Sequence, residues 1–180
     1  TSDIIKKYVG SKELINGNLR FCLWINDNQL REIEKNDTVK AKLNKVREAR
    51  KKSKAQSTRK FAEEPHRFVQ RAGAAENYTI AIPGVSSENR EYLPCDLLDN
   101  NCIISNKNFG LFDAPLWNLA LIVSRLHWVW VGTVCVRIEM RFSYSNTLGW
   151  NSFPLPKLTE KNKEDLTRCA EEILIARARY

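Results

Sequence analysis

Apolar and polar residues alternate over residues 134–145, and this is the clearest pattern in the sequence. The apolar positions are Val134, Val136, Ile138, Met140, Phe142 and Tyr144, and the polar positions include Arg137, Glu139, Arg141 and Ser143. Successive side chains of a β-strand point to opposite faces. The alternation therefore predicts a single strand with one packed face and one polar face.

A helical period precedes this segment in the N-terminal part of the chain. Its apolar stripe, spaced i, i+4 and i+7, consists of Val39, Leu43 and Val46. This spacing predicts an amphipathic helix over residues 38–54, with Asp37 or Thr38 as its N-cap. Residues 55–60 lose the period, so they are predicted to form a loop.

The remaining elements are shorter, apart from a helix at the C-terminal end. Thr159 can cap that helix, whose apolar side would hold Leu166, Ala170, Ile173 and Leu174. Helical spacing also predicts a helix over residues 116–126. Apolar segments predict strands over residues 20–25, 78–82, 102–105 and 109–112. We therefore predict an α+β fold, in which small mixed or antiparallel sheets pack with several helices and the last element is a C-terminal helix.

Positive charge is concentrated in one segment of the chain. Residues 40–60 contain ten Lys or Arg and one acid, Glu48, whereas the whole chain has a net charge of +8. A local excess of this size is typical of a surface that binds a polyanion such as nucleic acid. The alternative is a solvated basic helix that serves solubility.

The polar side of the alternating segment has its own chemistry. Arg137 and Arg141 could each bond guanine O6 and N7, and the carboxylate of Glu139 could accept from cytosine N4. The same row could instead be a ladder of ion pairs on a solvent face. From the spacing alone, both readings stay open.

Motifs for catalysis and cofactor binding are absent from the sequence. The seven glycines form no G-x-G, and neither a P-loop nor a G-x-S-x-G motif occurs. The five cysteines form no C-x-x-C pair, which favours reduced thiols in a cytoplasm. His127, beside Trp128, is expected to be a packed residue. We therefore expect no catalytic residue, cofactor or metal ligand in this chain, which also begins without Met and ends within a predicted helix, as a piece of a longer protein would.

Six short strings occur in an order that resembles a known family. The strings lie at residues 10–13, 22–24, 83–94, 124–130, 143–145 and 151–156, as GSKE, CLW, PGVSSENREYLP, SRLHWVW, SYS and NSFPLP. Together they are similar to the target recognition domain of MmeI-like enzymes, over about residues 8–178. These enzymes are single-chain bacterial restriction–modification proteins with an adenine-N6 DNA methyltransferase, often joined to a nuclease.

The resemblance implies a role for each part of the chain. Residues 1–156 would form the recognition domain, and residues 157–180 would begin a C-terminal helical extension that is cut short. Its implied partners are double-stranded DNA and the methyltransferase domain of the same parent chain, without a membrane. S-adenosylmethionine would bind in the parent enzyme and not in this fragment. The implied location is the bacterial cytoplasm.

The same resemblance assigns two groups of DNA-contacting residues. Backbone phosphates would be held by Arg47, Lys51, Lys54, Thr58, Arg59 and Lys60. Bases would be read by Ser86, Ser87, Arg90, Arg137, Glu139, Arg141 and Ser143. In this division, the first group positions the duplex and the second tests its sequence.

Two other functions remain open from the sequence. A module for RNA or single-stranded nucleic acid would use Trp128, Trp130 or Phe142 as stacking platforms, although these residues sit in apolar contexts that favour a core position. A self-sufficient enzyme would need catalytic residues that the sequence does not contain.

Overall fold

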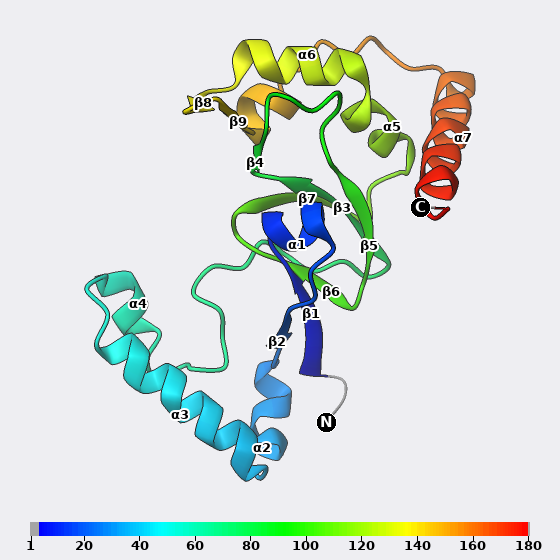
Figure 1. Ribbon diagram of the computed structural model, residues 1–180. Helices are drawn as coiled ribbons and strands as arrows, with labels where there is room; N and C mark the ends of the chain where they lie inside the picture. Colours follow the sequence, from blue (N-terminus) through cyan, green and yellow to red (C-terminus); the bar gives the residue numbers. More distant parts are fainter. Residues whose placement is uncertain (1–3, 180) are drawn as a thin grey trace. The chain divides into compact units, whose positions relative to one another are not determined.

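The computed structural model describes residues 4–179, and these residues form two compact units. The first unit combines the chain up to Tyr8 with Arg20–Arg71. The second combines Val9–Leu19 with the chain from Ala72 onward. Figure 1 shows the elements of both units along the chain, and each unit is described separately below.

The first unit begins with a pair of antiparallel strands and continues with helices. Strand β1 (Ile5–Val9) pairs antiparallel with β2 (Phe21–Leu23), and a short turn η2 (Asp27–Gln29) leads into α2 (Leu30–Ile33). Helix α3 (Asp37–Lys51) and the shorter α4 (Gln56–Lys60) follow. Its small core consists of Ile4, Ile25, Val39 and Leu43. The predicted amphipathic helix is therefore present, and the first two members of its apolar stripe are buried.

Two local predictions for this unit are wrong. Helix α3 is capped by Asn36, whose side-chain oxygen accepts from the Val39 backbone at 3.2 Å, instead of by Asp37 or Thr38. An Asn at this position satisfies one of the free N–H groups of the first turn. Residues 56–60 form the short helix α4 where the sequence predicts a loop, although five residues are too few to show a period.

The second unit is built on a three-stranded antiparallel sheet. Strand β3 (Tyr78–Pro83) lies between β5 (Asp96–Asp99) and β7 (Asn108–Phe112), and the unit also contains α1 (Ser11–Asn16) and β6 (Cys102–Ile104). After β3 the chain bends at Gly84, where an added Cβ would lie 2.1 Å from the carbonyl oxygen of Lys107. Only glycine fits that approach, and the chain continues directly into β4 (Val85–Ser86). Strand β4 begins a second small sheet, in the order β4, β9 (Arg141–Ser143), β8 (Arg137–Ile138).

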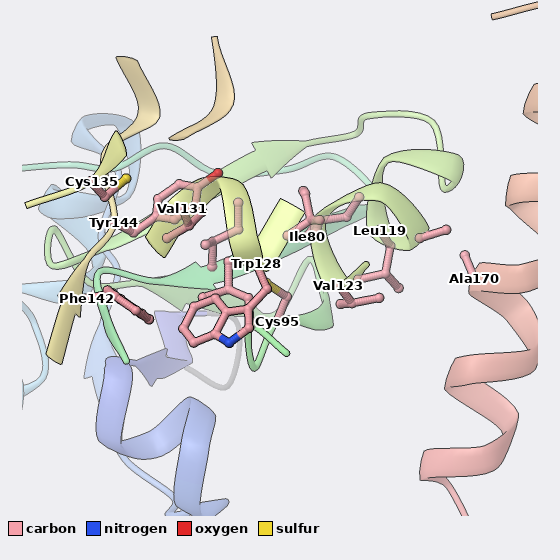
Figure 2. Close-up of a cluster of buried hydrophobic side chains, with 14 residues drawn as sticks. Ile80, Cys95, Leu119, Val123, Trp128, Val131, Cys135, Phe142, Tyr144 and Ala170 are labelled. Carbon is pink, nitrogen blue, oxygen red and sulfur yellow. The ribbon is translucent and has the colours of Figure 1, made fainter. Parts of the chain in front are cut away.

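Helices pack against the strands of the second unit and complete its core. They are α5 (Trp117–Val123), α6 (Arg125–Val134) and α7 (Glu160–Arg177), with a π-helical turn η3 (Asn146–Trp150) between α6 and α7. Figure 2 shows Cys135, Tyr144 and Phe142 at one end of the core, Ala170 of α7 at the other, and Trp128 between them. Thr159 caps α7 through its hydroxyl at 3.2 Å from the Asn162 backbone nitrogen, as predicted. The predicted α+β class is confirmed.

The predicted strand over residues 134–145 is wrong. Helix α6 extends through Val134, and the chain then forms a hairpin in which β8 and β9 are joined by Glu139 and Met140. Each arm of a hairpin has the same period of two, so the pattern alone does not show where the chain reverses. The helix predicted over residues 116–126 is likewise divided, because Ser124 ends α5 and caps α6.

His127 is the largest polar group in the core of the second unit. Its side chain is 0% exposed, and its Nε2 lies 3.3 Å from the Tyr144 hydroxyl. The ring of Phe153 meets it edge-on at 4.8 Å between centroids. Burial lowers the pKa of His127 to about 4, from an ordinary value of 6.5. The packed position expected from the sequence is confirmed, and it requires the neutral imidazole.

We predict that the second unit loses stability as the pH falls from 7 to 5. The unfolded state takes up a proton near pH 6.5, whereas the folded state resists protonation down to about pH 4. Stability is therefore complete above pH 6.5 and falls by about 2 kcal/mol by pH 5. Urea unfolding at both pH values, followed by tryptophan fluorescence, would measure it. His127→Gln should reduce the pH dependence; equal curves for the unsubstituted chain and His127→Gln would contradict the assignment.

Candidate nucleic-acid interface

The basic segment forms an exposed surface on the first unit. We define the basic surface as the exposed cations of α3, α4 and the turn between them: Lys40, Lys42, Lys45, Lys51, Lys52, Lys54, Arg59 and Lys60. The one acid of the segment, Glu48, pairs with Lys51 at 3.2 Å. A large excess of positive charge therefore faces solvent, as a site for a polyanion requires.

Arg50 differs from its basic neighbours because it points into the unit. Its Nη1 donates to the carbonyls of Phe61 and Glu64 at 2.8 and 2.9 Å, and its Nη2 donates to the carbonyl of Arg67 at 2.6 Å. A planar guanidinium can serve three acceptors at once, which a lysine ammonium on a flexible stem does less well. Arg50 therefore fastens residues 61–67 to α3, a role that the sequence did not distinguish.

Two of the predicted phosphate-binding arginines also have internal contacts. Arg59 donates from Nη1 to the carbonyls of Ser53 and Lys54, both at 2.8 Å, so it closes the turn after α3. Arg47 is half-buried and donates to Asn44 Oδ1 at 2.7 Å. Lys51, Lys54 and Lys60 are exposed, and Thr58 is half-buried. Of the predicted phosphate contacts, the three lysines and Arg59 are thus exposed, and Arg59 also has internal hydrogen bonds.

An ion cluster that the sequence did not indicate stabilises the end of this unit. The carboxylate of Asp27 accepts from His66 Nε2 and Arg67 Nε, both at 2.9 Å, and Arg67 Nη2 also contacts it. These hydrogen bonds hold the pKa of Asp27 well below its usual range. The cluster joins residues that are 39 and 40 positions apart, so no local pattern could reveal it.

The second unit presents the β8–β9 hairpin and the loop that follows β4. In the register of the sheet, Ser86 lies opposite Phe142 and Val85 lies opposite Ser143. This pairing brings together the two segments that were predicted to read bases. The loop is held on α6, because Trp128 Nε1 donates to the Arg90 carbonyl at 2.7 Å.

The hairpin separates the arginines that a single strand would place in one row. Arg137 lies opposite Phe142 and Ile138 opposite Arg141, so the two arginines point to opposite faces. The guanidinium of Arg137 lies 4.8 Å from the centroid of the Phe142 ring. Arg141 Nη2 donates to Glu139 Oε2 at 2.6 Å, and both side chains are exposed. The sequence pattern allowed a ladder of ion pairs along this row. The hairpin contains one ion pair of that row, between Glu139 and Arg141.

The loop residues differ in how far they reach solvent. Arg90 is exposed and Ser87 is half-buried, as is Ser143 of β9. Ser86 is only 3% exposed, and its hydroxyl has no hydrogen-bond partner. In this structure Ser86 therefore faces the interior and not a groove, because β4 pairs with β9 directly above the core.

The aromatic residues considered as stacking platforms are mostly internal. Trp128 and Phe142 are buried and meet edge-on at 5.0 Å between centroids. Trp130 is partly exposed, and its Nε1 donates to the Leu148 carbonyl at 3.2 Å. Two of the three platforms are thus unavailable to bases in this structure.

Neither a candidate metal cluster nor a membrane-spanning helix occurs within residues 4–179. In this range no group of three or more His, Cys, Asp or Glu side chains could hold a metal ion. No helix among the same residues has the length and apolar character needed to cross a bilayer.

Comparison with known proteins gives a family match and two similar proteins. The family described as "MmeI, target recognition domain" matches residues 1–157. The chain is 37% identical over 169 residues to DNA methyltransferase A of Bacillus subtilis (strain 168), which covers 94% of this chain and 19% of that protein. It is also similar to a chain of the solved structure titled "Structure of Type IIL restriction-modification enzyme MmeI in complex with DNA has implications for engineering of new specificities". That match has a TM-score of 0.90 and 34% identity and covers 98% of this chain and 24% of the other. The chain thus spans about a fifth to a quarter of these proteins.

We predict that Arg50→Ala destabilises the first unit by about 2 kcal/mol, because three backbone carbonyls lose a charged donor. Amide hydrogen exchange over residues 37–67 would report the local loss of protection. Arg50→Lys should recover little of this protection, since a single ammonium group replaces the planar guanidinium that serves three carbonyls. Lys51→Ala, the adjacent exposed cation, is the matched control and should leave exchange unchanged. Equal effects of the Arg50 and Lys51 variants would contradict the anchoring role.

Proposed function

Because this chain belongs to the MmeI target recognition domain family, we propose that it binds double-stranded DNA and reads its sequence for a restriction–modification DNA methyltransferase. The observation that carries this proposal is the basic surface of the first unit, where eight cations are exposed. Duplex DNA is a regular polyanion, and Lys and Arg contacts to it release counterions. The related MmeI structure was solved in complex with DNA, which supports the same partner here.

The first unit would hold the phosphate backbone. Lys51, Lys54 and Lys60 are exposed point charges on flexible stems, which suits contacts that do not depend on sequence. Arg59 and Arg47 each have internal bonds, so we propose that they orient the surface and offer their remaining N–H groups. Thr58 would add a hydroxyl donor from α4.

The second unit would read bases through its hairpin and the adjoining loop. Glu139 and Arg141 lie side by side, and their groups match the two halves of a G·C pair. Arg141 would bond guanine O6 and N7, while Glu139 would accept from cytosine N4. Their mutual ion pair would keep both groups in place until DNA replaces it. Arg90, Ser87, Arg137 and Ser143 remain candidates for further contacts, and Ser86 would support the loop from inside.

The catalytic steps would belong to the rest of the parent enzyme. We propose that the parent is a bacterial, cytoplasmic adenine-N6 methyltransferase. S-adenosylmethionine would bind in the methyltransferase domain of the parent and not in this fragment. Extruding an adenine from the duplex costs a few kcal/mol. Binding energy from the recognition domain would help to offset that cost, so the domain alone should bind DNA without methylating it.

We predict that Lys51→Ala and Lys54→Ala weaken DNA binding equally for all sequences. The slope of log affinity against log salt is negative, and each lost phosphate contact should make it less steep by about 0.9. Fluorescence anisotropy with a randomised duplex pool at several salt concentrations would measure this slope. Lys161→Ala removes an exposed charge from α7 and should have little effect. If Lys161→Ala weakens binding as much as Lys51→Ala does, net charge alone decides binding. Preference of the chain for a single-stranded competitor would instead support the RNA or single-strand alternative.

We predict that Arg141→Ala and Glu139→Lys change which base is preferred at one position of the site. A lost or reversed base contact costs about 1–3 kcal/mol of discrimination. Sequencing the bound fraction of the pool would show the change as a relaxed or altered position. Lys51→Ala should retain the original preference. If the hairpin variants weaken all sequences uniformly, the base-reading role is wrong.

A further inference from the structure

Large apolar side chains are exposed at the end of the β8–β9 hairpin. Val136, Ile138 and Met140 are 67%, 49% and 63% exposed, whereas the sequence pattern placed all three on a packed face. Single exposed apolar residues are ordinary, but three within five positions form a patch typical of a binding site. Of the other apolar members of the pattern, Phe142 and Tyr144 are buried and Val134 is half-buried.

The hairpin cannot bury this patch on its own sheet. Ile138 lies opposite Arg141, on the face away from Phe142 and Arg137. Phe142 fills the packed face, where it meets Trp128 and where an added Cβ at Gly132 would lie 3.2 Å from its ring. The base of the hairpin is therefore fixed on α6, while its tip projects from it (Figure 1).

The turn itself is strained in a way that presents Met140. Glu139 has φ 58°, in the left-handed region that usually requires Gly, Asn or Asp. A longer side chain is strained in this conformation, because its Cβ lies close to the following carbonyl oxygen. Such strain is concentrated at functional sites, where the surrounding structure maintains it. The tight reversal leaves Met140 at the end of the hairpin, next to the Glu139–Arg141 pair.

The charges around the patch indicate what covers it. Arg137 and Arg141 are exposed on the two faces of the same hairpin. Arg141 is already paired with Glu139, but an apolar protein surface would leave Arg137 without an anionic partner, whereas DNA offers phosphates beside stacked, apolar bases. Some DNA-binding proteins insert an apolar side chain such as Met, Ile, Leu or Phe between base pairs and unstack them.

We propose that Met140 is an apolar wedge that the hairpin inserts into the base stack of bound duplex DNA, with Ile138 packed beside it. This inference rests on the proposed function, since it requires that the chain bind DNA. The wedge would fix the position of the hairpin along the duplex, so that Glu139 and Arg141 meet one base pair. It would act through stacking and not through charge.

The test uses the 180-residue chain and a duplex selected from the randomised pool. Adenines of that duplex are replaced one at a time by 2-aminopurine, whose fluorescence rises when the base is unstacked. The unsubstituted chain should raise the fluorescence at one or two neighbouring positions. Met140→Ala should abolish the rise and weaken binding about tenfold, with an unchanged salt slope. Met140→Leu, which keeps an apolar group of similar size, should retain both the fluorescence rise and the binding affinity.

Matched controls separate the possible failures. Leu126→Ala removes a similarly exposed apolar side chain from α6 and should change neither readout. Weaker binding by Met140→Ala without any fluorescence rise in the unsubstituted chain would overturn the wedge and indicate a contact at the surface of the groove. No effect of Met140→Ala on either readout would overturn it in favour of a protein partner for the tip. Absence of duplex binding by the unsubstituted chain at low salt would instead overturn the proposed function, and this inference with it.

Discussion

The edge-on packing of Phe142 against Trp128 supports most of what the second unit presents to a partner. Phe142 belongs to the middle strand of the β4–β9–β8 sheet, so its burial holds both neighbouring strands on α6. The indole Nε1 of Trp128 donates to the Arg90 carbonyl, and this hydrogen bond fixes the loop after β4. Two segments that are some fifty residues apart in the chain thus share one apolar support. A loop and a hairpin supported in this way can keep side chains in place for base contacts, which tolerate little displacement.

The first unit shows how one run of positive residues is divided between structure and binding. Arg50 and Arg59 direct their guanidinium groups to backbone carbonyls, where a planar fork can satisfy several acceptors. The lysines have no comparable geometry and extend into solvent. Most of the charge that attracts a polyanion is therefore carried by lysine, while the arginines determine the shape of the surface that carries it.

The hairpin combines features that are each unfavourable for the isolated domain. A strained turn, exposed apolar side chains and a surface ion pair contribute little or negatively to stability. Their occurrence within seven residues is consistent with selection for binding instead of folding. The same residues disagree with the sequence pattern, and such disagreements are expected at functional sites.

The sequence by itself determined the α+β class, the basic amphipathic helix, the cap and buried face of α7, and the family. These features depend on local periods, on charge density and on ordered short strings, all of which are written along the chain. Only the tertiary structure decided that residues 137–143 are a hairpin, that Ser86 faces inward, and that Arg50 is an anchor. Each of these depends on a partner that is remote in sequence: Phe142 opposite Ser86, Trp128 against Phe142, or three carbonyls eleven or more residues beyond Arg50. A period of two is the same on both arms of a hairpin, so the sequence does not show where the chain reverses. The exposure of Met140 follows from its place in the turn, which only the tertiary structure shows.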